Sequence, residues 1–366
     1  MAFGRGAGLA VPRFLVAALA ELSAARGLAV AAGAIGLVLV GRAISQRRYQ
    51  LMELFPPIPY AGWSDTIATL HRFAQVVGKV RLAASPRRNH WWNVPFHLTG
   101  RGITTRPMGL DPTFAIDFDF VAHQLEVDAI DGRSVSFPIP GHSVATFHAE
   151  VVRALRAVGV DSIDISRARP FDLPDAARVF AADTDHATYD PVAVTRYWQV
   201  LSQVNLVLEE FAGRYSGKTS PVHHFWHTFD IALTRFADTA VDQPSSNDPV
   251  TREAYSREVI SSGFWFGDPT YPEPAFYSYT SPEPAGVADA PLPAGARWLE
   301  RGGSHLAVLP YADVRAAPQR RAAVLGFYED AYRAGASRAG WDIDRYACID
   351  GITDPQHPST RYRASS

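Results

Sequence analysis

The sequence predicts an α+β fold made of two pseudo-repeated halves, each a helix followed by antiparallel strands and a second helix, packed as one compact unit. Strict alternation of apolar residues over 113–121 predicts a strand with one buried face. Asp131-Gly132 is a tight hairpin turn between two apolar segments. Amphipathic segments with N-terminal caps flank these strands, and the same order of elements occurs again further along the chain.

The predicted divisions of the chain are a leader, two α+β halves and a polar tail, at residues 1–51, 52–160, 161–341 and 342–366. The leader carries six arginines and one glutamate. Its apolar run at 27–41 is shorter than the roughly 20 residues that span a bilayer. We therefore expect the leader to be either an extension ahead of a natural start at Met52 or a weak membrane anchor.

Composition limits the classes of function. A hydrophobic fraction of 47% is ordinary for a folded globular protein. The single cysteine, Cys348, rules out an internal disulfide framework and fits a reducing compartment, so we expect a cytoplasmic protein. The net charge of −2 gives no basic footprint, which argues against nucleic acid as a partner. We expect no membrane partner unless the run at 27–41 is a true anchor.

In the first half, Ser64-Asp65 caps the first helix and Gly159 ends the second. Phe114, Ile116 and Phe118 lie on one face of the alternating strand, and the acidic residues between them lie on the other. The predicted elements are, in order, a helix at 64–82, strands at 90–104, 113–121, 123–130 and 133–139, and a helix at 143–158.

In the second half, Asp190-Pro191 is a cap followed by a proline in the first turn, which predicts the start of a helix. The predicted elements are a helix at 190–211, a strand at 222–237, aromatic segments at 255–266 and 275–280, a strand at 304–309 and a helix at 319–334. The aromatic stretch at 263–284 is typical either of a pocket wall or lid, or of irregular core.

The two lysines of this arginine-rich chain fall at matching places in the two halves. Gly78-Lys79 aligns with Gly217-Lys218, and in the same register His90 faces His224. Tryptophan and arginine are nine residues apart in each half, at Trp92 and Arg101 and again at Trp226 and Arg235. A compact ammonium kept only at two related positions indicates a specific role, so we expect both lysines to contribute charge to one cavity.

The cations of this alignment point to an anionic ligand. Lysine and arginine side chains converging from two halves hold a carboxylate or a phosphate. The alternative is that they neutralise buried carboxylates such as Asp117, Asp119 and Asp230. The cations are Lys79, Arg81, Arg101, Lys218 and Arg235.

His223, His224 and His227 raise the question of a metal site. On a strand, His223 and His224 face opposite sides, so the three cannot converge on one ion. Further ligands for a metal could come from Asp230, Glu253 or Glu258. A second segment, Asp183-Thr184-Asp185-His186, resembles a calcium loop but lacks its glycine and its closing glutamate. We therefore assign no residue to a metal, and any cofactor stays open.

Several short segments of the sequence resemble one bacterial family, the domain of unknown function 5996, over about residues 54–341. The resemblance implies a cytoplasmic protein without an established activity, and a start no earlier than Met52. Where that family has Phe and Gly this chain has His224 and His227, so His90 and His223 become the better candidates. Where it has His this chain has Arg257, so Glu253 and Glu258 become the candidates in that segment. The segments are Gly78-Lys79-Val80-Arg81-Leu82, Asn89-His90-Trp91-Trp92, Ser220-Pro221-Val222-His223, Phe225-Trp226, Phe229-Asp230, Thr234-Arg235-Phe236, Arg252-Glu253-Ala254-Tyr255-Ser256 and Gly263-Phe264-Trp265.

From these patterns we expect a small-molecule binder or enzyme with a polar pocket at the junction of the halves. Histidine and glutamate would exchange protons, cations would hold the ligand and aromatic side chains would exclude water. The alternatives are a non-catalytic structural or partner-binding protein with buried ion-pair networks, and a metal-dependent enzyme using His and Glu or Asp ligands. The predicted catalytic residues are His90, His223, Glu253 and Glu258, and the predicted ligand-binding residues are Lys79, Arg81, Trp92, Arg101, Lys218, Trp226, Asp230, Arg235, Tyr255 and Trp265.

Overall fold

The computed structural model describes residues 53–353, except 162, 164, 167–172 and 174. The chain divides into a unit Met1–Glu53 and a unit Leu54–Ser366, and the described helices and strands belong to the second. The predicted leader segment at 27–41 therefore lies outside the described residues. Within the described residues, no helix is both long enough and apolar enough to cross a membrane.

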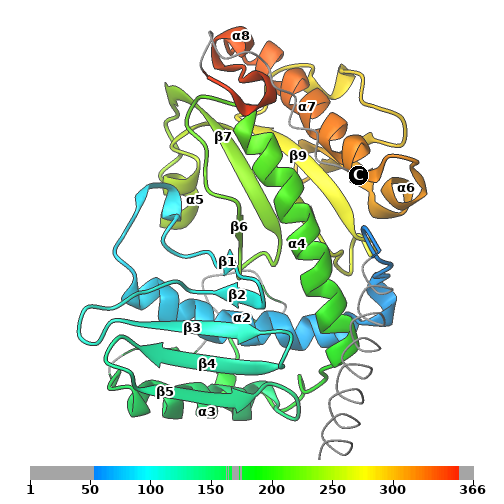
Figure 1. The fold of residues 1–366 in the computed structure, drawn as a ribbon. Helices are drawn as coiled ribbons and strands as arrows, with labels where there is room; N and C mark the ends of the chain where they lie inside the picture. The colour runs from blue at the N-terminus through cyan, green and yellow to red at the C-terminus, as the bar shows by residue number, and fades with distance from the viewer. Residues whose placement is uncertain (1–52, 162, 164, 167–172, 174, 354–366) are drawn as a thin grey trace, which may run out of the picture. The chain divides into compact units, whose positions relative to one another are not determined.

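The first half forms a five-stranded antiparallel meander in the order β1-β2-β3-β4-β5. The predicted alternation is confirmed, because Phe114, Ile116 and Phe118 are buried on one face. Two helices cover this face (Figure 1), where Phe73 and Phe147 stack with ring centroids 4.0 Å apart. The elements are α2 (Ser64–Ala84), β1 (His97–Leu98), β2 (Gly102–Thr104), β3 (Phe114–Asp119), β4 (Gln124–Ala129), β5 (Ser134–Pro138) and α3 (Val144–Ala157).

The second half forms a six-stranded antiparallel sheet in the order β10-β11-β9-β8-β7-β6. The predicted cap is confirmed, since the Asp190 side chain accepts the Val192 N–H at the start of α4. The helices α4 and α7 pack against one face of this sheet (Figure 1). The elements are α4 (Pro191–Gly213), β6 (His223–His224), β7 (Ile231–Ala240), α5 (Pro249–Ala254), β8 (Arg257–Trp265), β9 (Ala275–Ser281), β10 (Arg297–Arg301), β11 (Ser304–Pro310), α6 (Tyr311–Ala316), α7 (Arg320–Arg338) and α8 (Ile343–Tyr346).

The two sheets meet at one pair of backbone hydrogen bonds. The Phe96 N–H donates to the His224 carbonyl at 2.8 Å, and the His224 N–H donates to the Phe96 carbonyl at 2.9 Å. This bridge places the next residues, His97 of β1 and His223 of β6, opposite each other, with ring centroids 6.2 Å apart. We call this place the seam. It is the structural junction of the two halves.

Two predicted strands are wrong in extent. Residues 90–104 contain a short 3-10 helix before β1 and β2, because His90 and Trp91 have positive φ angles of 56° and 59°, which no strand allows. The strand predicted at 222–237 is split into β6 and β7, and Phe229, with φ 60°, lies in the turn between them. Strand β10 and the short helices α5, α6 and α8 are not among the predicted elements.

The order helix, antiparallel strands, helix occurs in both halves, but the aligned Gly-Lys pairs lie in different local structure. Gly78 and Lys79 are inside α2, whereas Gly217 and Lys218 follow the end of α4. Glycine is also required for a different reason in each pair, because a side chain would meet a different aromatic ring. A Cβ on Gly78 would overlap the indole ring of Trp226, and a Cβ on Gly217 would lie 2.6 Å from Cε1 of Tyr215. The duplication itself stays a prediction.

The close approach of Gly78 to Trp226 gives a first testable prediction. Gly78→Ala gains about 1 kcal/mol of helix propensity. The new methyl group must displace an indole ring that is 0% exposed, and such overpacking costs about 1–3 kcal/mol or more. We expect Gly78→Ala to lower the free energy of unfolding in urea. The matched control is Gly326→Ala on α7, where a Cβ meets nothing within 4 Å, and there we expect a gain.

Candidate functional site

The side of the six-stranded sheet that faces away from α4 and α7 carries a row of polar side chains beside an apolar cluster. We call it the outer face. Thr234, Ser261 and Tyr279 lie side by side across β7, β8 and β9 on this face. The Thr234 hydroxyl donates to the Ser261 hydroxyl at 3.1 Å, and the Tyr279 and Tyr255 hydroxyls are 2.9 Å apart. Polar side chains from three strands and a loop are therefore linked by hydrogen bonds.

The seam lies at one edge of the outer face and gathers positive charge. Arg81 is 5% exposed, and its guanidinium donates from Nε to the Pro95 carbonyl at 2.7 Å and from Nη1 to the Ser85 hydroxyl at 3.4 Å. Arg88 and Arg106 are exposed at the surface. Burial, together with charge repulsion from Arg106 and Arg88, lowers the pKa of Arg81 to about 10. Among the described residues, none of these three arginines has a carboxylate within ion-pair distance.

The two histidines of the seam are buried and neutral. Burial, together with the charges of Arg106 and Arg81, lowers the pKa of His97 to about 3. Burial also holds the pKa of His223 well below its usual range, and His97 and Arg81 add to this. Within the described part of the chain, Nε2 of His97 and Nδ1 of His223 have no hydrogen-bond partner although both atoms are buried. The seam thus combines unused imidazole nitrogens with uncompensated cations.

A second cluster on the outer face surrounds His90. Its backbone N–H donates to Oε1 of Glu253 at 3.0 Å, and its Nδ1 lies 3.2 Å and 3.3 Å from the carbonyls of Glu253 and Ala254. Its Nε2 lies 2.8 Å from Nζ of Lys218, which is 5.2 Å from the ring centroid of Trp92. The structure therefore brings together four residues that the sequence analysis assigned to one site, namely His90, Trp92, Lys218 and Glu253.

A third group is the buried carboxyl of Asp230, which receives hydrogen bonds from the hydroxyls of Thr228 and Tyr277. Burial raises the pKa of this carboxyl. Trp265 packs against Tyr277 with ring centroids 5.6 Å apart, and its indole N–H has no partner among the described residues. Tyr255 lies beside the nearby Tyr279, and both tyrosines line an open cleft.

The cleft has a volume of about 290 Å³. At its rim His305 donates from Nδ1 to Oε1 of Glu283 at 2.7 Å, and this bond raises the pKa of His305. The lining residues are Tyr255, Tyr279, Thr280, Ser281, Glu283, Arg301, Ser304, His305 and Leu306. A ligand there would contact the pair of hydrogen-bonded tyrosines described above.

Other predicted site residues lie elsewhere. Arg235 points to the opposite face of the sheet, where its guanidinium lies 3.5 Å above the ring of Phe211. Glu258 accepts the indole N–H of Trp341 at 2.9 Å and is thereby separated from Glu253. The predicted convergence of all the cations on one anion is therefore not what the structure shows for Arg235.

The remaining predicted residues lie in three different settings. Arg101 is exposed and pairs with Asp119 on the first sheet, with Nε and Oδ2 2.5 Å apart. Trp226 is fully buried, and its indole donates to the Val94 carbonyl at 2.7 Å. Lys79 is half-buried on α2, so the two lysines stand in different settings. A single cavity shared by both lysines stays a prediction.

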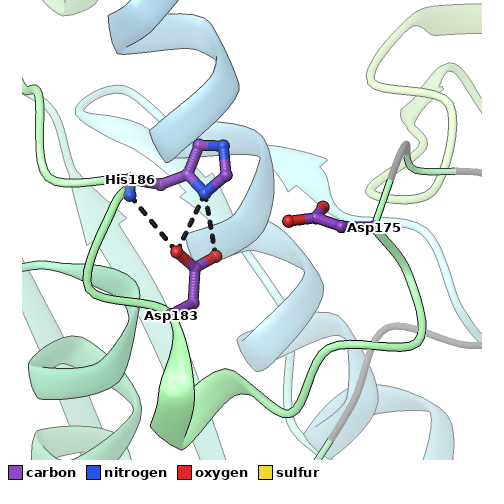
Figure 2. A group of neighbouring side chains, drawn as sticks. All are labelled: Asp175, Asp183 and His186. Atoms are coloured by element: carbon purple, nitrogen blue, oxygen red, sulfur yellow. Dashed lines mark hydrogen bonds and ion pairs between the residues drawn. The ribbon is translucent and has the colours of Figure 1, made fainter.

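The segment that resembled a calcium loop contributes to a compact acidic group. Asp175, Asp183 and His186 each offer an atom within 4.8 Å of the others (Figure 2). His186 donates from Nδ1 to Asp183 at 2.9 Å, and Arg72 approaches Asp175 to 2.6 Å and Asp183 to 3.6 Å. Arg178 lies 3.2 Å from Asp183 as well. Two guanidinium groups already balance these carboxylates, which explains the cluster as an ion-pair network.

Sequence reasoning missed His97, Arg88 and Arg106. Nothing in the local sequence marks them, because their meeting with His223 depends on pairing between strands that are more than a hundred residues apart. It also missed Tyr277 and Tyr279. Their spacing of two within a strand did carry a signal, since residues at i and i+2 share one face.

Comparison with known proteins gives a family and no activity. The sequence model of the family described as "Family of unknown function (DUF5996)" matches residues 55–348, most of the chain. The chain matches no curated protein and no solved structure at a significant level.

Proposed function

The chain belongs to this family of unknown function, and from the site itself we propose that it binds a small molecule carrying a phosphate or carboxylate group at the seam. The observation that supports the proposal is the set of Arg81, Arg88 and Arg106, which have no carboxylate partner in the described structure, beside the unused nitrogens of His97 and His223. Clustered arginines repel one another unless an anion lies between them.

The positions of the three arginines suit a ligand that enters from solvent. Arg88 and Arg106 are exposed at the surface, and Arg81 is buried beneath. Guanidinium groups donate paired hydrogen bonds to the oxygens of phosphate or carboxylate. A neutral imidazole can donate one further N–H, and satisfying a buried polar atom relieves a cost of about 1–3 kcal/mol. The anion would thus stabilise the junction of the two sheets.

The alternative, a structural or partner-binding protein, draws support from the networks of Arg235 and of Arg72, which are internally balanced. The seam differs from both of them, since its cations lack counter-charges in the described residues. A metal-dependent enzyme has no comparable support, because the acidic cluster of Figure 2 is held by arginines.

The proposal predicts that anions stabilise the folded protein. A ligand that binds only the folded state raises the free energy of unfolding by RT ln(1 + [L]/Kd). Inorganic phosphate, pyrophosphate and citrate should therefore raise Tm in a concentration-dependent way, and calorimetric titration should show binding.

The variant that tests the site is Arg88→Gln combined with Arg106→Asn. Both side chains are exposed, and asparagine tolerates the φ of 60° found at Arg106. We expect the double variant to fold and to lose the anion-dependent rise in Tm. Arg153→Gln, an exposed arginine on α3 paired with Glu150, is the matched control and should keep it. An equal response of all three proteins, or none in the unmodified chain, would refute anion binding at the seam.

A further inference from the structure

Lys218 has surroundings that differ from those of an ordinary surface lysine. Its ammonium nitrogen lies 2.8 Å from Nε2 of His90, and 5.2 Å and 5.0 Å from the ring centroids of Trp92 and Phe236. In the part of the chain that the structure describes, no carboxylate lies within ion-pair distance of it. The side chain is still exposed, so a molecule from solvent can reach the nitrogen.

The hydrogen bonds of His90 fix its tautomer. Its Nδ1 faces the carbonyl oxygens of Glu253 and Ala254, which only accept hydrogen bonds, so this nitrogen carries the proton. The lone pair on Nε2 is then directed at Lys218. Burial, with the charge of Lys218, lowers the pKa of His90, which keeps the ring neutral. His90 is therefore placed as a proton acceptor for the amine.

The backbone supports this placement. His90 has a φ of 56°, a conformation that non-glycine residues adopt rarely, and it is held there by the bond from its N–H to Glu253. The same segment provides Trp92, which packs beside the amine. A strained residue anchored from a separate helix is typical of a functional position.

The charges around the amine have opposing effects. Burial and the nearby Arg257 lower the pKa of Lys218, whereas Asp238 and Glu253 raise it, and the net direction is downward. A larger fraction of the side chain is therefore the free amine at neutral pH than for an unperturbed lysine. Only the free amine is a nucleophile.

We propose that Lys218 is a reactive amine that forms an imine with a small aldehyde or ketone, and that His90 carries the proton. The free amine attacks the carbonyl carbon, forming the C–N bond as the carbonyl π electrons move to oxygen. The nitrogen then passes a proton through Nε2 of His90 to that oxygen. The hydroxyl leaves as water, taking up the second amine proton by the same route, and the C=N bond forms. The inference is independent of anion binding at the seam.

The presence of two lysines makes the test direct. The full chain is treated with propanal and sodium cyanoborohydride at pH 7, which reduces an imine to a stable propylamine, and peptide masses give the rate at each lysine. We expect Lys218 to react at least about fivefold faster than Lys79, the internal reference. In Lys218→Arg only the slow label at Lys79 and the label at the chain terminus should remain.

The role of His90 is tested with His90→Asn, since asparagine accepts a positive φ. We expect the rate at Lys218 to fall toward that of Lys79, while the rate at Lys79 stays unchanged. A thermal unfolding curve confirms that the variant is folded. Equal rates at the two lysines of the unmodified protein would overturn the proposal, and an unchanged rate in folded His90→Asn would remove the assigned role of His90. Anion binding at the seam is measured separately, by the anion titration of the variant that combines Arg88→Gln with Arg106→Asn.

Discussion

Lowering the pH from 6.5 to about 4 is expected to unfold this protein well before most of its carboxylates are protonated. Burial lowers the pKa of His71 and His97 to about 3 and that of His224 and His227 to about 4, and it holds the pKa of His223 well below its usual range. Unfolded histidines titrate near 6.5. Between these values the unfolded chain binds more protons, so stability is full above pH 6.5 and falls as the pH drops.

The size of this effect follows from linkage. At pH 5 each such histidine costs about 2 kcal/mol. The three that are almost fully buried, His97, His223 and His224, together cost about 6 kcal/mol, which is comparable with the whole stability of an ordinary domain, about 5–15 kcal/mol. Circular dichroism during acid titration would give the midpoint, expected between about pH 5 and pH 4.

His224→Phe provides the variant that tests acid unfolding. His224 is fully buried, so removing it takes away one titrating group, although its bonds to Tyr197 and to the Asp230 carbonyl are lost. The free energy of unfolding should therefore fall less steeply as the pH is lowered, whether or not the variant is less stable than the unmodified protein at pH 7. The matched control is Phe147→Leu, which weakens the buried packing but removes no titrating group, so it should lower stability and leave the slope unchanged. A chain that keeps its full stability at pH 4 would contradict the buried, neutral state of these histidines.

Arg235→Met is expected to lower the free energy of unfolding by about 3 kcal/mol, because it breaks a largely buried ion pair and leaves Glu329 with only Arg214, 3.9 Å away, as a counter-charge. Arg235 is 1% exposed, donates to the Phe211 carbonyl at 2.5 Å and lies 3.6 Å from Glu329. Its guanidinium also stacks on the ring of Tyr332, 4.4 Å from the centroid. Urea denaturation measures the loss.

Two further variants separate charge from packing at this position. Combining Arg235→Met with Glu329→Gln removes both charges. The double variant should therefore lose less free energy of unfolding than the two single variants lose in sum. Arg101→Met, the position that the sequence alignment of the halves equates with Arg235, should cost less than about 1 kcal/mol. Its side chain is 59% exposed, and its buried partner Asp119 keeps the hydrogen bonds from the Val121 and Ala122 N–H groups. Similar losses at Arg101 and Arg235 would show that burial is not the cause.

Much of the fold could be predicted from local patterns. The alternation at 113–121, the hairpin turn at Asp131-Gly132 and the cap at Asp190 each depend on a few adjacent residues, and all three are where the sequence placed them. The splitting of 222–237 could not be foreseen, since the turn requires a positive φ at Phe229 that a phenylalanine rarely adopts.

The site could be predicted only in part, for a geometric reason. His90, Trp92, Lys218 and Glu253 come together as expected, because each belongs to a segment with an unusual polar or aromatic composition. Glu258 instead bonds to Trp341, away from the outer face. A change from helix to strand lies between Glu253 and Glu258, and the face on which Glu258 falls depends on where β8 begins.

The single backbone bridge between Phe96 and His224 also bears on how the protein avoids aggregation. Two separate sheets would have four edge strands with unpaired amide and carbonyl groups, and each could pair with a strand of another chain. Because β1 is joined to β6, two of these edges lie inside the molecule, and only the edge strands β5 and β10 remain at the ends of the described sheets. Weakening the bridge would therefore expose new sites for intermolecular β-pairing.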